Sequence, residues 1–188
     1  PITCQNNLAE WAGYMFITDF MTRHPILVPP TLPASEAQKI LTENHIRHLP
    51  VVDGNRKLTG LVTRQQLLVR ADAIGNLSMW EVARFLADLR VSQIMVRARE
   101  VVTIRRENVI EDASQIMVER KIGCLPVVDD DGAVVGIVTE SDLLRAYQEM
   151  LGSTTSGVRA TVRIPDGTGE LAKLTTLIAG NKWSVEGI

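Results

Sequence analysis

The sequence predicts a mixed α/β fold made of two copies of one small unit, because the same landmarks recur in the same order along the chain. Three pairs of residues correspond, at spacings of 95 − 21 = 74, 126 − 50 = 76 and 136 − 60 = 76 positions: Met21 with Met95, Pro50 with Pro126, and Gly60 with Gly136. This period is longer than that of the common solenoid units and suits a duplicated α/β domain.

Hydrophobic periodicity predicts the same order of elements in each copy. Extended stretches are expected at 26–28 and 101–104, helices at 35–44 and 109–120, and paired strands at 49–52 and 58–63 and again at 125–128 and 134–139. Ala37, Ile40 and Leu41 fall on one face of the first helix. Gly- and Asp-containing turns favour a hairpin between the paired strands, and a second helix is expected just past Thr63 and Thr139.

A further helix is predicted to connect the two copies over residues 72–90. Ser78 is followed three positions later by Glu81, which is the pattern of a capping box. We expect the apolar residues of this helix to pack back onto the copies: Trp80, Phe85, Leu86 and Leu89.

The composition argues against several classes of protein. The 188 residues carry a net charge of −2, which gives no electrostatic reason to expect nucleic acid or an anionic membrane as a partner. No apolar run reaches the roughly 18 residues that span a bilayer, and the first residues lack the basic and apolar regions of a signal peptide. With only Cys4 and Cys124, we expect no disulfide framework, no zinc site and a reducing cytoplasm.

The repeated segments resemble CBS domains. The signature segments are IRHLPVVD at 46–53 and IGCLPVVD at 122–129, and each copy has a Met before them and a G-h-V-T strand after them. The resemblance covers about residues 17–148. It implies a Bateman module, in which two repeats form a pseudo-twofold α/β unit with two clefts between them, and which usually dimerises.

The strongest candidate site is the segment GIVTESD at 136–142, which completes the family's nucleotide motif G-h-h-T/S-x-x-D. A strand that runs into a helix N-terminus presents unpaired N–H groups to a phosphate. The resemblance implies that Asp142 accepts from the ribose hydroxyls and that Thr139 lies by the phosphates. Ser141, in the same motif, is a further candidate binding residue. The alternative is structural: Thr139 as an N-cap and Asp142 as a first-turn acid.

The first copy departs from this motif, because Gln66 stands where the second copy has Asp142. A neutral amide cannot offer two charged acceptors to a diol. We therefore expect one competent cleft, served by Asp142, and one weak or empty cleft.

Other candidate binding residues come from the resemblance, and each has a structural alternative. Basic residues at the positions of Arg47 and His48 reach phosphates in some relatives, but both residues also suit a strand edge. The remaining candidates line the expected cleft or are ordinary core residues: Thr22, Ile26, Ile122, Gly123 and Cys124. Cys124 has the strongest structural alternative, that of a small buried apolar residue.

The segment after the second copy changes in composition. Residues 152–157 are a Gly/Ser/Thr linker, a strand is expected at 158–164 and a helix at 171–179, and 184–188 begin another strand. This arrangement resembles the first half of an ACT domain, with Thr168 in place of the family's Pro. A CBS pair followed by an ACT domain resembles the acetoin-utilisation regulatory proteins.

These observations predict six regions: an N-terminal extension at 1–16, CBS repeats at 17–71 and 91–150, a helical connector at 72–90, a linker at 151–157 and a partial ACT-like domain at 158–188. The expected function is a regulatory module that senses an adenine nucleotide, either AMP, ADP, ATP or S-adenosylmethionine, and signals to an unknown partner. It requires no cofactor and forms a homodimer. The alternative is a scaffold with vestigial clefts. An enzyme is not expected, because no nucleophile–base pair, HExxH motif or P-loop is present.

Overall fold

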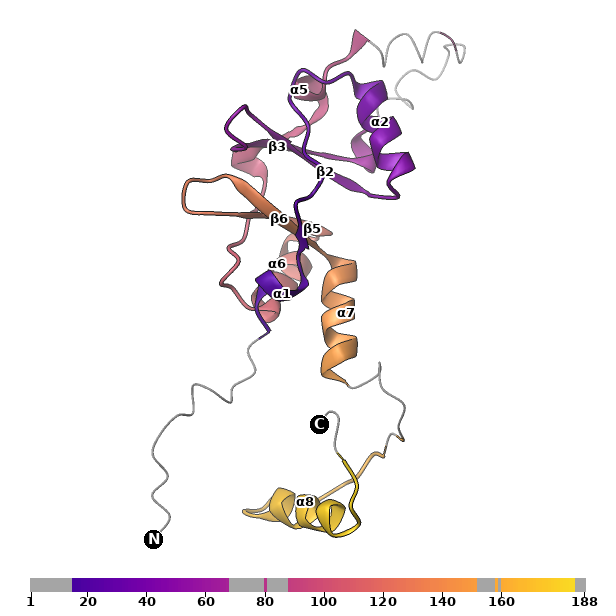
Figure 1. Ribbon diagram of the computed structural model, residues 1–188, viewed down its shortest axis with the longest axis vertical. Helices are drawn as coiled ribbons and strands as arrows, with labels where there is room; N and C mark the ends of the chain where they lie inside the picture. Colours follow the sequence, from indigo (N-terminus) through magenta and orange to yellow (C-terminus); the bar gives the residue numbers. More distant parts are fainter. Residues whose placement is uncertain (1–14, 68–79, 81–87, 152–157, 159, 185–188) are drawn as a thin grey trace. The chain divides into compact units, whose positions relative to one another are not determined.

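The computed structural model describes residues 15–67, 80, 88–151, 158 and 160–184 (Figure 1). It divides into two units, Pro1–Leu143 and Leu144–Ile188, and each is considered separately. The predicted capping box of the connector helix, most of its apolar face, and the 152–157 linker lie outside the described residues, as do residues 1–14 of the N-terminal extension.

Each copy contains one long helix and one antiparallel hairpin, as the periodicity predicts. The first copy has α2 (Ala34–Glu43), β2 (His48–Val52) and β3 (Leu58–Thr63), and the second has α6 (Ile110–Arg120), β5 (Cys124–Val128) and β6 (Val134–Thr139). The observed helices and strands agree with the predicted ones to within one residue at each end. The extended stretches add one parallel bridge each, Val28 with Val51 and Ile104 with Val127.

The third strand of each sheet comes from the other half of the chain. β1 (Thr22–Arg23), near the start of the first copy, pairs antiparallel with β6 of the second, giving the order β1-β6-β5. β4 (Val96–Arg97), near the start of the second copy, pairs with β3 of the first, giving β2-β3-β4. Each of the two sheets therefore combines strands from both copies.

Two short helices accompany these exchanged strands. α1 (Ile17–Phe20) lies against the second copy, since the Ile17 N–H donates to the Asn108 carbonyl at 2.8 Å. α5 (Val91–Ile94), followed by β4 and the 3-10 turn η1 (Ala98–Glu100), lies against the first copy, where the Val91 N–H donates to the Leu32 carbonyl at 2.8 Å. The contacts of the two segments are equivalent.

Close packing explains why glycine recurs in the third position of β3 and β6. A methyl group added at Gly60 would lie 2.5 Å from the sulfur of Met95 and 2.5 Å from the Val96 carbonyl oxygen. One added at Gly136 would lie 2.5 Å from the sulfur of Met21. The repeated Met and Gly landmarks are thus partners across the two copies.

Apolar side chains from both halves of the chain fill the core of the first copy. Ala37 and Leu41 of α2 pack with strand residues, and Val91 and Ile94 of α5 join the same cluster. Leu89, predicted to pack back onto the repeats, lies against this cluster. The same prediction is wrong for Trp80, which is 75% exposed.

The hairpin turns join the two copies. The Leu58 N–H donates to the Gly132 carbonyl at 3.3 Å, and the Val134 N–H donates to the Arg56 carbonyl at 2.9 Å. Arg56 and Gly132 occupy equivalent positions and both have left-handed backbone conformations, with φ of 62° and 79°. Reciprocal bonds between equivalent residues are what a local twofold axis requires.

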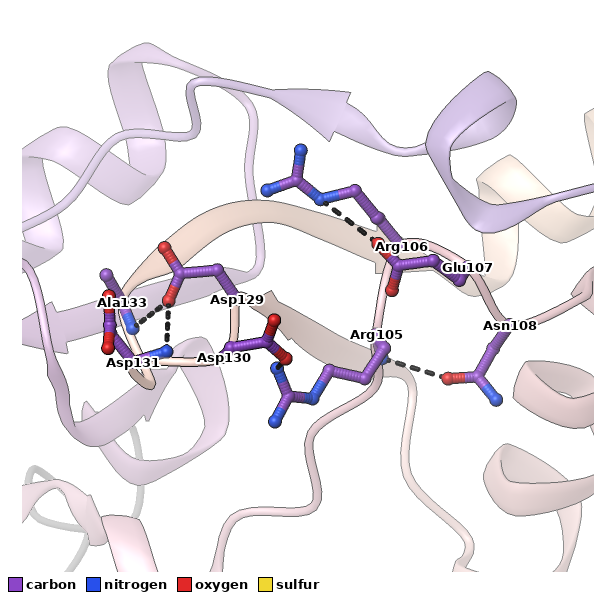
Figure 2. Close-up of polar contacts among 8 residues, drawn as sticks. All are labelled: Arg105, Arg106, Glu107, Asn108, Asp129, Asp130, Asp131 and Ala133. Carbon is purple, nitrogen blue, oxygen red and sulfur yellow. Dashed lines mark hydrogen bonds and ion pairs between the residues drawn. The ribbon is translucent and has the colours of Figure 1, made fainter.

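A carboxylate closes each of these turns. Figure 2 shows Asp129 in the second copy, whose Oδ1 accepts from the Asp131 N–H at 3.1 Å and the Ala133 N–H at 2.8 Å. Beside it, Arg105 forms an ion pair with Asp130 at 2.7 Å. Asp53 closes the first turn in the same way, so a side-chain acceptor supplements the backbone hydrogen bonds in both reversals.

α7 (Glu140–Met150) begins directly after β6 and ends in the second unit. The second unit also contains α8 (Glu170–Gly180), which confirms the predicted helix to within one residue and has no buried residue. The predicted strand at 158–164 is wrong: its described residues are irregular and exposed. A strand needs a neighbouring strand to bond, and the described part of this unit contains none. Ser184 is also irregular, and the rest of the last predicted strand is outside the described residues.

Candidate functional site

The start of α7 holds the residues of the nucleotide-binding motif in one compact turn. Thr139 is the last residue of β6, and both its N–H and its hydroxyl donate to Oδ2 of Asp142, at 2.9 and 2.8 Å. A first-turn side chain that accepts from the residue before the helix is half of a capping box. Asp142 is 9% exposed and is the one polar or charged residue classed as buried in the described part of the chain.

The first copy makes the same turn with a neutral side chain. Oε1 of Gln66 accepts from the Thr63 N–H at 2.9 Å, and the Gln66 N–H donates to the Thr63 hydroxyl at 3.4 Å. An uncharged amide therefore closes this turn as well as a carboxylate does. The negative charge of Asp142 is an addition that capping alone does not require.

Strand pairing brings two other predicted residues to the end of β6. Cys124 of β5 lies opposite Thr139. Thr22 of β1 lies opposite Ile137, two positions earlier, because the N-terminal segment is exchanged onto the second copy. Three chain segments thus converge where β6 passes into α7.

The remaining cleft-wall candidates are more dispersed. Ile26 is 38% exposed, on the segment that leaves β1. Ile122 follows α6, where its N–H donates to the Met117 carbonyl at 3.1 Å. Ser141 is exposed in the first turn of α7. These three residues therefore lie on three different segments.

An ion pair connects the first copy to the start of α7. Nη2 of Arg47, the residue before β2, lies 3.6 Å from Oε2 of Glu140, the first residue of α7, and the two side chains are 58% and 56% exposed. The Glu140 N–H also donates to the Gly123 carbonyl at 3.2 Å. A methyl group added at Gly123 would lie 3.1 Å from Oε2 of Glu140. Glycine at this position leaves room for the carboxylate.

Burial and these two charges set the protonation of the central residues. Burial, and then the Arg47 charge, lower the pKa of His48, while Glu140 opposes them. Burial raises the pKa of the Cys124 thiol to about 12, with Glu140 adding to the rise and Arg47 opposing it. A neutral imidazole and a protonated thiol therefore flank the ion pair at neutral pH.

Sequence reasoning did not single out Glu140. A signal was present in the repeat, because the position equivalent to Glu140 is Arg64 and the position equivalent to Arg47 is Gly123. Opposite charges at one matched position indicate that the two copies differ electrostatically there. No group of three or more His, Cys, Asp or Glu residues that could hold a metal ion occurs among the described residues.

The family model for the CBS domain matches residues 17–72 and 91–149. The chain belongs to the CBS domain family. As a tandem pair it is similar to the CBS domain pair of protein MJ0100, solved in complex with 5′-methylthioadenosine and S-adenosyl-L-methionine, with 28% identity and a TM-score of 0.59 over 71% of this chain and 99% of that one.

Two further solved CBS proteins are similar to this one. CBSX2 in complex with AMP is 29% identical, with a TM-score of 0.60 over 71% of this chain and 96% of that one. A putative acetoin utilization protein (AcuB) from Vibrio cholerae is also 29% identical, with a TM-score of 0.59 over 71% of this chain and 90% of that one. The resemblance to acetoin-utilisation proteins is therefore found for the CBS pair, and no comparison extends it to an ACT domain.

The CBS pair also occurs as part of larger proteins. A homoserine O-acetyltransferase of Methanohalobium evestigatum is 28% identical over 76% of this chain, but the chain spans only 26% of that protein. The chain spans about a quarter of the length of the first curated relatives that it matches. None of the described helices is long and apolar enough to cross a membrane.

Proposed function

We propose that this CBS pair is a regulatory module that binds an adenosine ligand at the start of α7 and passes the signal to a partner. The observation that carries the proposal is the contrast between Asp142 and Gln66. Both close the same turn, so capping explains an acceptor at this position but not its charge. A charged carboxylate suits the paired hydroxyls of a ribose, which form charge-assisted hydrogen bonds with it.

The proposed roles follow the positions of the residues. Asp142 accepts from the ribose, while Thr139 and Ser141 lie near the 5′ group at the positive end of the α7 dipole. Arg47 and His48 approach from the first copy. Thr22, Ile26 and the segment containing Ile122, Gly123 and Cys124 form the walls of the cleft.

Similar CBS pairs support the class of ligand. The pair from MJ0100 was solved with 5′-methylthioadenosine and S-adenosyl-L-methionine, and CBSX2 with AMP. All three molecules share an adenosine group and differ at the 5′ position. We therefore propose adenosine recognition by Asp142 as the common element, without any catalytic residue or required cofactor.

The second candidate is a scaffold whose site is vestigial, and the cap geometry favours it. The Thr139–Asp142 bonds would exist in a protein that binds nothing, since Thr63 and Gln66 form an equivalent turn. The two candidates differ in what the Asp142 charge does, and a substitution that keeps the cap but removes the charge separates them.

Calorimetric titration with AMP, ADP, ATP, S-adenosylmethionine and 5′-methylthioadenosine tests the proposal. Asp142→Asn keeps an amide oxygen for the Thr139 N–H, as Gln66 does for Thr63. We expect this substitution to weaken the binding of adenosine ligands by 10- to 150-fold. This factor corresponds to the loss of about 1.5–3 kcal/mol, the contribution of a hydrogen bond to a charged group. Gln66→Ala is the matched control and should bind as the wild type does.

Three outcomes have distinct meanings. Equal affinity of Asp142→Asn and wild type would reject the site. Equal losses in the Asp142 and Gln66 variants would mean that the two copies bind alike. A wild-type chain that binds none of the five ligands would favour the scaffold.

We also propose a homodimer, because a flat CBS pair leaves apolar helix faces to be covered. Val118 of α6, for example, is 75% exposed. Light scattering at micromolar concentration should give twice the chain mass, and a monomer mass would count against the dimer. The reducing cytoplasm is the proposed location. We also propose that residues 158–188 belong to an ACT-like domain, and that the signal reaches these residues through α7.

A further inference from the structure

We propose that Glu140 competes with a ligand's phosphate for Arg47, and so sets which 5′ substituent the adenosine site accepts. This inference rests on the proposed function and concerns its selectivity. Without ligand, the Arg47 guanidinium lies 3.6 Å from the Glu140 carboxylate. A phosphate near Thr139 must take Arg47 from this carboxylate and must approach a second negative charge.

The carboxylate that pairs with Arg47, and the glycine that leaves room for it, occur only in the second copy. Glu140 can lie over the start of β5 because the neighbouring residue is Gly123, where a methyl group would stand 3.1 Å from its Oε2. In the first copy the equivalents of Glu140 and Gly123 are Arg64 and Arg47. The equivalent of the Arg47–Glu140 pair would join Gly123 to Arg64, and neither residue carries a carboxylate. The first copy therefore has no ion pair of this kind at the equivalent position.

The local charges favour ligands without phosphate. Glu140 and Asp142 are both acidic residues of the first turn of α7, where Arg47 supplies the positive charge of the ion pair and the helix dipole a partial one. A neutral thioether or a cationic sulfonium at the 5′ position meets no repulsion there. A phosphate does, and its penalty grows with the number of phosphates. The site thus selects 5′-thioether and sulfonium adenosines over adenosine polyphosphates.

The pair is weak enough to be exchanged. Both side chains are more than half exposed, and an ion pair of this kind contributes little because water screens it. Glu140 therefore does not block phosphate. It reduces phosphate affinity by a factor of about 1.5 to 5, the range of a surface ion pair.

Titration of the full chain with AMP, ATP and 5′-methylthioadenosine tests this inference in a double-mutant cycle. Glu140→Gln should bind AMP about 1.5- to 5-fold more tightly than wild type, and ATP with a larger gain. Its affinity for 5′-methylthioadenosine should not change. In the Arg47→Gln background the gain for AMP should be clearly smaller, because no guanidinium remains to be released and only the direct repulsion by Glu140 is removed. Glu149→Gln removes the same charge further along α7 and should change no affinity.

The result separates this inference from the proposed function. Measurable AMP binding that is equal in wild type and Glu140→Gln would overturn the competition. So would an AMP gain of equal size in both Arg47 backgrounds, since Glu140 would then act by direct repulsion alone, or an equal gain in Glu149→Gln. If no variant binds any of the three adenosine probes, the proposed function fails and the inference with it.

Discussion

The sulfur of Met21 lies so close to the α-carbon of Gly136 that a methyl group added there would be only 2.5 Å away. Met21 lies near the start of the first CBS repeat and Gly136 lies inside the second. Met95 and Gly60 repeat this contact in the opposite sense. The sheet of each copy is therefore completed by a short strand from the start of the other copy.

This packing predicts different costs for the two equivalent Gly→Ala substitutions. At Gly60 the new methyl group would meet the Val96 carbonyl at 2.5 Å, a backbone atom of β4 that cannot move alone. At Gly136 the nearest backbone oxygen, that of Thr22, is 3.2 Å away, and the closest atom is the flexible end of Met21. We expect Gly60→Ala to lower the free energy of unfolding by about 1–3 kcal/mol, and Gly136→Ala by less.

Urea unfolding followed by circular dichroism measures both changes. Gly54→Ala is the control, because a methyl group at Gly54 would meet no atom within 4 Å. Met21→Ala should partly restore the stability of Gly136→Ala, because it removes the closest atom. Met95→Ala should not restore the stability of Gly60→Ala, because the Val96 carbonyl remains 2.5 Å away. Equal losses at Gly60 and Gly136 would contradict the described packing.

Removing the acceptor from either helix cap should destabilise the protein by a similar amount. Asp142→Ala and Gln66→Ala each leave the N–H of the preceding Thr without its side-chain acceptor. We expect a loss on the order of 1 kcal/mol for each. Asp142→Asn should retain most of the stability, because its amide oxygen can replace Oδ2.

Thermal unfolding of the three variants checks this prediction. If Asp142→Asn is as unstable as Asp142→Ala, the carboxylate charge contributes to folding itself. A loss of ligand binding in Asp142→Asn could then not be assigned to the ribose alone.

His48 should make the protein less stable as the pH falls. Burial and the Arg47 charge lower its pKa in the folded state, so the unfolded chain takes up a proton first, near the ordinary pKa of about 6.5. The unfolded state then binds more protons, and stability declines as the pH falls below that value until the folded imidazole titrates. The stability difference between pH 8 and pH 5.5 should be smaller in His48→Gln than in wild type.

Titration of the His48 ring by NMR tests the cause of this shift. Arg47→Gln removes a charge that lowers the pKa and should raise it, while Glu140→Gln removes a charge that raises the pKa and should lower it further. Shifts in the same direction in both variants would contradict the assigned electrostatics.

Cys124 should be almost unreactive in the folded protein. It is 3% exposed, and burial raises the pKa of its thiol to about 12. At pH 8 its thiolate population is on the order of a thousandfold lower than that of an ordinary cysteine. In a Cys4→Ser variant, iodoacetamide should react slowly in buffer and rapidly in urea. Rapid labelling of the folded chain would show that the β5 end is open to solvent.

Sequence patterns predicted the elements of each repeat but not the exchange between them. α2 and α6 have apolar residues at helical spacing, and β-branched residues mark the hairpins, so local signals were sufficient. β1 and β4 have only two residues each, both too short for any periodicity, and their pairing depends on contacts distant in sequence.

The site was predicted only in part, because a local motif identifies the residues of one turn but not contacts that are distant in sequence. Thr139 and Asp142 belong to one turn, and a local motif identifies them. The contact of Arg47 with Glu140 joins residues from different repeats, which no spacing reveals. The error at 158–164 arose from clean alternation, which indicates a strand only where another strand is available to pair with it.

The exchanged strands have a consequence for how this protein folds and how it arose. β4 meets β3 across 97 − 60 = 37 positions, whereas β1 meets β6 across 136 − 23 = 113 positions. Because the second sheet depends on pairing across most of the CBS pair, the pair should fold slowly and melt as one cooperative unit. A single repeat would keep an open edge on its hairpin, and two separate copies could cover those edges only by trading their leading segments. The present chain has the architecture of such a domain-swapped dimer made permanent by gene fusion.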